Sequence, residues 1–239
     1  MGRNIGLITG AASGIGLKTV KRLLKKGWEV YGLDNDESGL ERSSKEINNS
    51  NFIAKPCDLR SEEVLKNIIV EIQEDRQKIN SLIACAGVLK LGTLEDMSTE
   101  DFDLVFDINV RGLWLSAREA LPLLKNAASR GELSRIILLS SVSALRPKID
   151  SGAYSASKAA VSQLTRVLSV ECAKYEITVN AIAPGTVNTP MVNNKNTPQS
   201  QGNWRPSGPS PLGRIAEPSD IANVIEFLLS KEASYVTGT

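Results

Sequence analysis

The sequence predicts one α/β domain built on a doubly wound parallel sheet with helices on both faces. Short aliphatic or β-branched runs alternate along the chain with longer amphipathic stretches, the pattern of parallel βαβ units. The 239 residues suffice for one large domain, and no linker divides them. A net charge of +1 and 41% hydrophobic residues are typical of an ordinary globular chain.

Six short runs are the predicted strands. They are rich in isoleucine, leucine and valine, as buried strands of parallel sheets are. In chain order they span residues 5–9, 29–33, 51–55, 81–84, 135–140 and 177–183.

Amphipathic helical patterns fill the intervals. One follows Ser61, which suits an N-cap, and another begins at Pro218, which suits a first helical turn. Their apolar faces comprise Val64, Leu65, Ile68, Ile69 and Ile72 in the first and Ile221, Val224, Ile225 and Leu228 in the second. Residues 190–212 break the alternation, because they are rich in Asn, Pro, Gly, Ser and Gln, and we expect a mobile substrate lid there.

The chain contains no histidine, which excludes Ser-His-Asp and Cys-His nucleophile systems and His-ligated metal sites. We expect no metal. Cys57, Cys85 and Cys172 form no CxxC pair, so we expect reduced, mostly buried thiols. Near-neutral charge without a basic run argues against nucleic acid as a partner. No apolar run is long enough for a membrane span, and none resembles a signal peptide, so we expect a cytoplasmic protein with no membrane partner.

A glycine-rich turn follows the first predicted strand and leads directly into a helical run. It reads Thr9-Gly10-Ala11-Ala12-Ser13-Gly14-Ile15-Gly16. Glycines here let the backbone approach a pyrophosphate, whose charge is received by N–H groups at the helix start. A tight turn with close helix packing would give a similar pattern, but the strand–turn–helix context favours a Rossmann-like dinucleotide site. The expected cofactor contacts are Gly10, Ser13, Gly14, Ile15 and Gly16.

Asp34 ends the second predicted strand, near the spacing at which a carboxylate holds the adenosine ribose. Such a carboxylate accepts hydrogen bonds from both ribose hydroxyls and repels a 2′-phosphate. No Lys or Arg in the glycine turn or directly after Asp34 would receive that phosphate, so we expect NAD as the cofactor. Asp34 would also suit a turn or a helix cap. Asp58, with Leu59 beside it, is expected at the adenine, although a plain loop acid would look the same.

Tyr154 and Lys158 open an apolar helical pattern and share one helix face, and Ser141 ends the fifth predicted strand. With these residues the chain closely resembles the short-chain dehydrogenase/reductase family, whose Ser, Tyr and Lys correspond to Ser141, Tyr154 and Lys158. The resemblance implies that Tyr154 is the general acid/base and that Ser141 orients the substrate oxygen. A nearby ammonium favours phenolate, which is the role implied for Lys158. Ordinary packing or solvation would explain each residue alone.

The resemblance extends over nearly the whole chain. It implies hydride transfer between a nicotinamide and a substrate carbon, interconverting a secondary alcohol, or a diol, and a ketone. Asn109 corresponds to the catalytic asparagine, which would position a water that connects Lys158 to solvent. In the family the residue matched by Thr189 contacts the nicotinamide carboxamide. The further cofactor contacts that the resemblance implies are Ala86, Gly87, Tyr154, Lys158, Pro184, Gly185 and Val187.

Two features depart from the family pattern. Ala84-Cys85-Ala86-Gly87 stands where the family commonly has Asn-Asn-Ala-Gly, which removes two amides and leaves the backbone contacts of Ala86 and Gly87. The family usually continues past a segment like Tyr235-Val236-Thr237-Gly238 into a seventh strand, whereas this sequence ends at Thr239. We therefore expect that C-terminal strand to be missing.

Substrate walls are expected from several apolar residues, although core packing would explain them as well. They are Val88, Leu89, Leu145, Ile149, Met191 and Trp204, with Arg146, Lys148 and Arg205 as anchors. Three short stretches, residues 87–92, 146–149 and 211–216, are weakly similar to the siderophore-pathway 2,3-dihydro-2,3-dihydroxybenzoate dehydrogenases, which would place Lys148 at a substrate carboxylate.

Two alternative functions remain open on this sequence. One is a 3-oxoacyl-thioester reductase of the same family, which normally uses NADPH, and the other is a non-catalytic NAD(H)-binding sensor on the same fold. Residues 102–124 and 159–172 are apolar enough to pair across a two-fold axis, and the family is usually dimeric or tetrameric. We therefore expect a homodimer or homotetramer.

Overall fold

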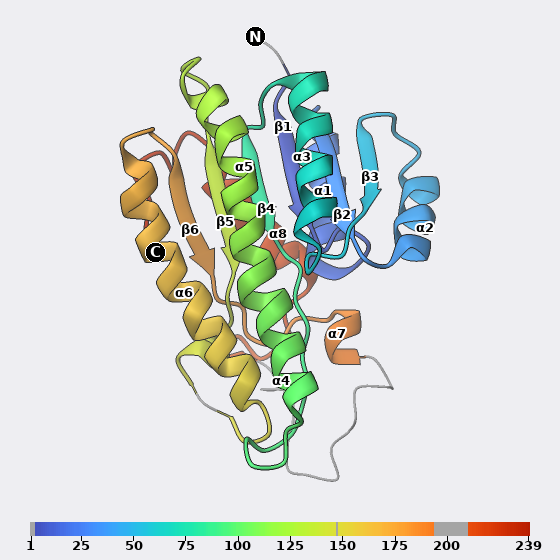
Figure 1. Cartoon of the computed structure of the whole chain (residues 1–239), viewed down its shortest axis with the longest axis vertical. Helices are drawn as coiled ribbons and strands as arrows, with labels where there is room; N and C mark the ends of the chain where they lie inside the picture. The colour runs from blue at the N-terminus through green and yellow to red at the C-terminus, as the bar shows by residue number, and fades with distance from the viewer. Residues whose placement is uncertain (1–2, 147, 194–209) are drawn as a thin grey trace.

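A six-stranded parallel sheet forms the centre of the molecule (Figure 1). The structure is a computed structural model and describes residues 3–146, 148–193 and 210–239. The spatial order is β3-β2-β1-β4-β5-β6. All strands run parallel, but β2 and β3 are added on one side of β1 and β4, β5 and β6 on the other, so the order of the strands reverses between β1 and β4. The strands are β1 (Ile5–Thr9), β2 (Glu29–Asp34), β3 (Phe52–Pro56), β4 (Ser81–Ala84), β5 (Arg135–Leu139) and β6 (Thr178–Ile182). The predicted doubly wound fold is confirmed, and its reversal point is where such sheets bind ligands.

All six predicted strands are present, and four of them differ from the expected ranges at one or both ends by one residue. β2 and β3 each continue one residue further because Asp34 and Pro56 are still paired in the ladder. β5 ends at Leu139, although the Ser140 N–H still donates to the Ile182 carbonyl at 2.8 Å. β6 is shorter than predicted at both ends.

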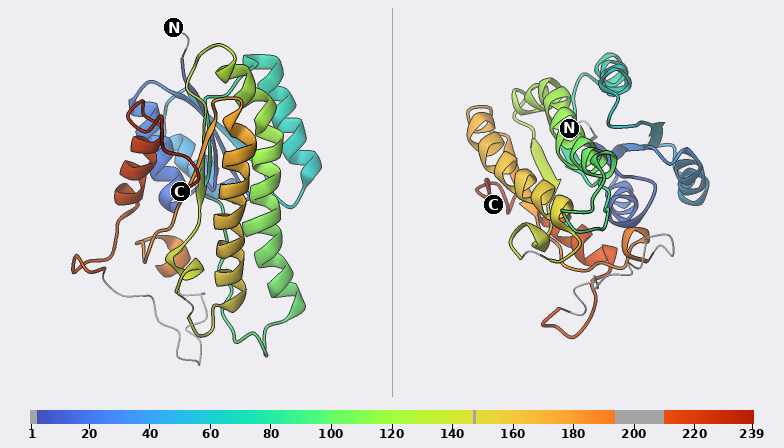
Figure 2. Two further views of the ribbon diagram at one scale, coloured as in Figure 1. Left: turned by 90° about the vertical axis from the view of Figure 1, so that its left-hand side faces the viewer. Right: turned by 60° about the horizontal axis from the view of Figure 1, so that its bottom comes forward.

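Helices cover both faces of the sheet, as Figures 1 and 2 show. Successive residues of a strand point to opposite faces, so Leu7 packs into one core and Ile8 into the other. The first core is shared with α3 (Glu62–Arg76), α5 (Leu113–Ala128) and α6 (Gly152–Ala173). The second is shared with α1 (Gly14–Lys25), α2 (Glu37–Ile47) and α8 (Pro218–Leu228).

The predicted helix starts at α3 and α8 are confirmed. The Ser61 side chain caps α3 by accepting from the Val64 N–H, and Pro218 occupies the first turn of α8. The buried faces are narrower than predicted, because Val64 and Val224 are 39% and 43% exposed. Each lies at the edge of its apolar stripe, where the helix surface curves away from the sheet.

The helix run before β5 contains a change of geometry. α4 (Thr99–Phe106) passes into the π-helical turn η1 (Asp107–Gly112) and then into α5. Such turns are rare and often mark functional sites. The turn carries Asn109, whose side chain is fully buried.

The last residues of the chain run along the outer edge of β6. The Gly238 N–H donates to the Val179 carbonyl at 2.8 Å, and the Thr239 carbonyl accepts from the Ala181 N–H at 2.8 Å. Residues 237–239 therefore pair with the outer edge of β6.

The three cysteines are free thiols. Cys57 and Cys172 are buried and Cys85 is half-buried, so the prediction of reduced, mostly buried thiols is confirmed. Among the described residues, no helix is both long and apolar enough to cross a bilayer.

Candidate active site

The glycine-rich turn after β1 is tight, and its glycine positions leave no room for a side chain. Gly10 and Gly14 adopt positive φ angles of +72° and +54°, a region that favours glycine. A Cβ on Gly16 would lie 2.0 Å from the Gly10 carbonyl oxygen, and one on Gly10 would lie 2.8 Å from the Ala86 nitrogen. This packing places the unpaired N–H groups of the first turn of α1 directly after β1, a cradle that fits a pyrophosphate.

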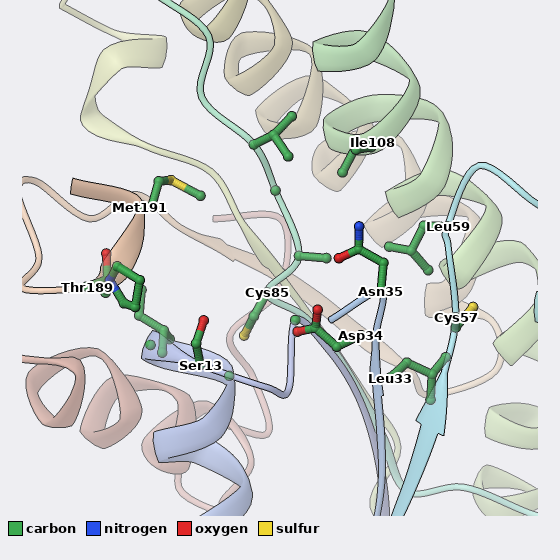
Figure 3. A pocket seen from close by; sticks show the side chains of 18 of the residues that line it. Ser13, Leu33, Asp34, Asn35, Cys57, Leu59, Cys85, Ile108, Thr189 and Met191 are labelled. Carbon is green, nitrogen blue, oxygen red and sulfur yellow. The ribbon is translucent and has the colours of Figure 1, made fainter. Parts of the chain in front are cut away.

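A cavity of about 230 Å³ opens at the carboxyl ends of β1, β2 and β4 (Figure 3). Thr189 and Met191 lie toward one end of it and Leu59 toward the other, with Cys85 between them. Eleven of the predicted cofactor contacts line it: Gly10, Ser13, Gly14, Ile15, Gly16, Asp34, Asp58, Leu59, Ala86, Gly87 and Thr189. Pro184 and Val187 do not line it, and Val187 is buried in the core beside α8.

The Asp34 side chain lies at this cavity and is held by backbone donors (Figure 3). It accepts from the Ala12 N–H at 2.9 Å and from the Asp36 N–H at 3.0 Å. The cap of α2 is Asp36, which accepts from the Gly39 N–H, so Asp34 is not the helix cap. No lysine or arginine occurs among the described residues that line the cavity.

Asp58 lies at the rim of the same cavity and pairs with Arg60. The Arg60 Nη2 is 2.6 Å from the carboxylate, and the Arg60 N–H donates to it at 2.9 Å. The hydrogen bond from the Arg60 side chain holds the pKa of Asp58 below its usual value. Asp58 is therefore an ionised acceptor at neutral pH.

A second, smaller cavity of about 70 Å³ adjoins the first, because Met191 lines both. Ser141, Tyr154 and Gly185 line it, and these come from the ends of β5 and β6 and from the start of α6. The remaining lining residues are Leu89, Val142, Ser143, Lys148, Ser151, Thr186 and Val192.

Ser141, Tyr154 and Lys158 come together beside this cavity, as predicted. Ser141 and Tyr154 both line this cavity, and the Lys158 Nζ lies 5.7 Å from the centre of the Tyr154 ring. Burial raises the pKa of Tyr154, and the neighbouring Ser141 hydroxyl opposes this increase in part. The Lys158 Nζ donates to the Leu139 carbonyl at 2.7 Å, and burial lowers the pKa of Lys158 to about 8.

Asn109 reaches the same place from η1. Its Oδ1 accepts from the Val88 N–H at 2.8 Å, and its Nδ2 donates to the Val88 carbonyl and to the Ser157 Oγ, both at 3.0 Å. A Cβ on Gly87 would lie 3.1 Å from the Asn109 Oδ1 and 3.4 Å from the Lys158 Nζ. Asn109 thus joins the connection after β4 to α6, close to the Lys158 ammonium.

Sequence reasoning missed the hydroxyls that fix this arrangement. The Ser140 Oγ donates to the Lys158 carbonyl at 3.0 Å and lies 2.8 Å from the Ser162 Oγ. The Thr9 Oγ1 accepts from the Ala86 N–H at 3.2 Å. The sequence held one weak sign of this role, because Ser140 adjoins the predicted site residue Ser141. The partners of Ser140 and Thr9 lie far away in the chain, so these hydrogen bonds could not be predicted.

Three of the expected substrate walls are placed differently. Leu145 and Ile149 are 77% and 68% exposed and line neither cavity, so that prediction is wrong. The connection after β5 begins with the short 3₁₀ turn η2 (Val142–Ala144), and the two side chains beyond it face solvent. Val88 lines the larger cavity instead of the smaller one. Trp204 and Arg205, with residues 194–209 of the expected lid, lie outside the described residues.

The fold and this site define a nicotinamide-dependent oxidoreductase, and comparison with known proteins identifies the family. Residues 10–239 match a family model described as enoyl-(acyl carrier protein) reductase. The chain belongs to the short-chain dehydrogenase/reductase family of nicotinamide-dependent oxidoreductases, and its relatives include enzymes that act on CH–OH groups. The predicted family membership is confirmed.

Several relatives cover almost all of the chain. It is 34% identical to the 3-oxoacyl-(acyl-carrier-protein) reductase FabG of Rickettsia bellii, over 97% of this chain and 91% of the relative. It is 32% identical to cyclopentanol dehydrogenase of a Comamonas species, over 100% and 96%. The 2,3-dihydro-2,3-dihydroxybenzoate dehydrogenase of Bacillus subtilis is 29% identical, over 98% and 91%.

A solved structure shows the same fold. The 3-ketoacyl-(acyl-carrier-protein) reductase of Brucella melitensis complexed with NADH aligns with a TM-score of 0.88 at 31% identity. The alignment covers 98% of this chain and 94% of that one.

Proposed function

We propose that the protein is an NAD-dependent oxidoreductase that interconverts a secondary alcohol, or a diol, and a ketone. The observation that carries the proposal is the junction of the two cavities. One combines a glycine turn with Asp34, and the other is lined by both Ser141 and Tyr154. Because Met191 lines both, a cofactor in the first would face a substrate in the second.

The residues of the larger cavity fit a dinucleotide. The turn of Gly10, Gly14 and Gly16 would receive the pyrophosphate, and Asp34 would accept from the adenosine ribose hydroxyls. Asp58 and Leu59 would hold the adenine. At the other end, Thr189, together with Gly185 on the wall of the adjoining cavity, would hold the nicotinamide. When bound, the cofactor supplies the hydride acceptor for oxidation or the hydride donor for reduction.

Tyr154 would exchange a proton with the substrate oxygen, giving it up in ketone reduction and taking it in alcohol oxidation. The Tyr154 phenol is protonated at neutral pH in the free protein, as an ordinary tyrosine is, and burial raises its pKa and so disfavours the phenolate. Ser141 would hydrogen-bond the same oxygen and orient it. Positive charge from Lys158, and from the oxidised nicotinamide, would favour the phenolate that alcohol oxidation requires.

Asn109 would act as a positioning residue. Its three hydrogen bonds hold the segment after β4 against α6 beside Lys158. By the family resemblance, a water placed there would carry protons between Lys158 and solvent.

NAD is favoured over NADP because a 2′-phosphate would lie beside the Asp34 carboxylate, with no lysine or arginine among the described lining residues. Fluorescence titration with NADH and NADPH tests this on the wild type and on Asp34→Asn, which keeps a hydrogen-bond acceptor. Loss of the charged acceptor should weaken NADH binding by roughly 10- to 100-fold. Tighter binding of NADPH than NADH by the wild type would overturn the proposal for the cofactor.

Turnover is tested with NAD and a panel of secondary alcohols and diols, and with NADH and the matching ketones. Tyr154→Phe removes only the hydroxyl and should reduce kcat by about 100-fold or more. Tyr235→Phe is the matched control, because Tyr235 is fully exposed and lines neither cavity. NADH binding without Tyr154-dependent turnover of any substrate would favour a sensor.

A 3-oxoacyl-thioester reductase is the second candidate, favoured by the 34% identity to FabG. It predicts that acetoacetyl-coenzyme A is reduced faster than small cyclic ketones. The same assay decides between the two, with NADH and NADPH compared side by side.

A further inference from the structure

We infer that the protein binds a small inorganic anion of the size of chloride inside the fold, between the Arg135 guanidinium and the hydroxyls of Ser81 and Thr178. These residues are the first of β5, β4 and β6, so they lie at the amino ends of the strands. Both cavities of the candidate active site lie at the carboxyl ends. The anion site is therefore separate from them, and the inference does not depend on the proposed function.

The three side chains share one row and one face of the sheet. Arg135 is in register with Ser81 on one side and with Thr178 on the other. Register partners of parallel strands point to the same face, and so do alternate residues of one strand. Two positions further along, Ile83 and Ile137 belong to the core beneath α1 and α8, so Arg135 and its two neighbours face that core. Figure 2 shows α8 packed over this side of the sheet.

All three side chains are buried and carry polar atoms that lack a partner. Arg135 is 4% exposed, Ser81 is fully buried and Thr178 is 9% exposed. The Arg135 Nε, the Ser81 Oγ and the Thr178 Oγ1 have no hydrogen-bond partner among the described residues. The guanidinium donates from Nη1 to the Ser134 carbonyl at 3.0 Å. Buried donors without a partner are costly, because folding has removed their hydrogen bonds to water.

The charge of Arg135 has no counterion in the part of the chain that the structure describes. Burial lowers the pKa of Arg135, and no neighbouring carboxylate opposes this. A guanidinium still stays protonated at neutral pH, so this core holds an uncompensated positive charge. The nearest acid in the sequence, Glu132, pairs with Lys78 and accepts from the Asn80 amide. Glu226 on the covering helix α8 pairs with two cations at the end of α1.

A small anion satisfies these groups together. It would balance the guanidinium charge and accept hydrogen bonds from the Nε and from both hydroxyls. A water molecule would accept from the same donors but leave the buried charge uncompensated. The space beside Ser81 is narrow, because a Cβ on its register partner Gly6 would lie 3.4 Å from the Ser81 Oγ and 3.6 Å from the Trp28 ring. This packing favours a monatomic anion over sulfate or phosphate.

The test follows thermal unfolding while chloride replaces gluconate at constant ionic strength. With a Kd of about 10 mM, the melting temperature of the wild type should rise by roughly 3–5 °C between 1 and 100 mM chloride. Arg135→Met has a similar length and no charge, so it should lose this dependence and be at least as stable as the wild type in gluconate. Arg166→Met, on an exposed position of α6, is the matched control and should keep the wild-type dependence.

Two further measurements do not depend on the folding of Arg135→Met. Thr178→Val keeps the β-branched shape and removes one donor, so it should weaken the apparent chloride affinity by about three- to tenfold. Crystals grown in bromide should show an anomalous peak within hydrogen-bonding distance of the Arg135 Nε.

Three results would overturn the inference. The first is a chloride dependence that is absent from the wild type or equal in wild type and Arg135→Met. The second is density beside the Arg135 Nε without an anomalous signal, which would identify a water molecule. The third is bromide at this position without any effect of chloride on melting, which would indicate an adventitious ion only.

Discussion

Lys158 is a buried cation, and its replacement gives a test in which stability depends on pH. The side chain is 4% exposed, and the Nζ donates to the Leu139 carbonyl. Burial lowers the Lys158 pKa from its ordinary 10.5 to about 8, so the folded protein disfavours the charged form. Lys158→Met keeps most of the apolar stem and removes the titrating group.

The magnitude follows from the change in pKa. Each tenfold change in acidity is worth about 1.4 kcal/mol, so the charged form is disfavoured by about 3 kcal/mol on folding. Between pH 8 and 10.5 the unfolded chain holds a proton at Lys158 that the folded chain has released, and the wild-type free energy of unfolding gains from this as the pH rises. The stability of Lys158→Met relative to wild type should therefore fall by about 2 kcal/mol between pH 7 and pH 9.5. The lost bond to Leu139 costs about 1–3 kcal/mol at every pH and leaves this slope unchanged.

Urea unfolding of both proteins across this pH range measures the difference, provided that the m-values agree. Lys45→Met on α2 is the control, because its side chain is 82% exposed, and it should show no such slope. Parallel pH curves for the wild type and Lys158→Met would refute the claim that Lys158 is a desolvated ammonium. In turnover assays the same variant should lose most of its activity at every pH.

Three further changes test other parts of the structure. Gly16→Ala would place a Cβ 2.0 Å from the Gly10 carbonyl oxygen, so it should destabilise the fold by about 2 kcal/mol or more and weaken NADH binding, as a thermal melt and a titration would show. Asn109→Ala leaves the buried backbone groups of Val88 without a side-chain partner and should cost about 2 kcal/mol together with a larger loss of kcat than of NADH affinity; an unchanged kcat would contradict its positioning role. Val170 lies on α6 and is 78% exposed. Val170→Glu should therefore change the free energy of unfolding by less than about 0.5 kcal/mol. If α5 and α6 pair across a two-fold axis, sedimentation of this variant should show monomer, whereas a wild type that is itself monomeric would contradict the predicted oligomer.

Local patterns predicted much of this molecule. The strands and the caps at Ser61 and Pro218 depend on neighbouring residues, so periodicity and capping preferences were sufficient to find them. The position of Ser141 and Tyr154 at one cavity was predicted because their spacing follows a known family pattern. The errors concern orientation. The exposure of Val64 and Ile149 depends on how far the sheet and the neighbouring connections reach, which the sequence pattern does not contain.

The sequence by itself determined the class of fold, the glycine turn, the acidic end of β2 and the Ser, Tyr and Lys of the site, because each is encoded in residues a few positions apart. Only the tertiary structure decided which of these groups meet. It joined the two cavities at Met191, placed Asn109 against Val88 through a π-helical turn, and set Lys148 on the wall beside Tyr154. The physical reason is that these contacts form between segments brought together by sheet order and by burial, so their distances and pKa values depend on the whole fold.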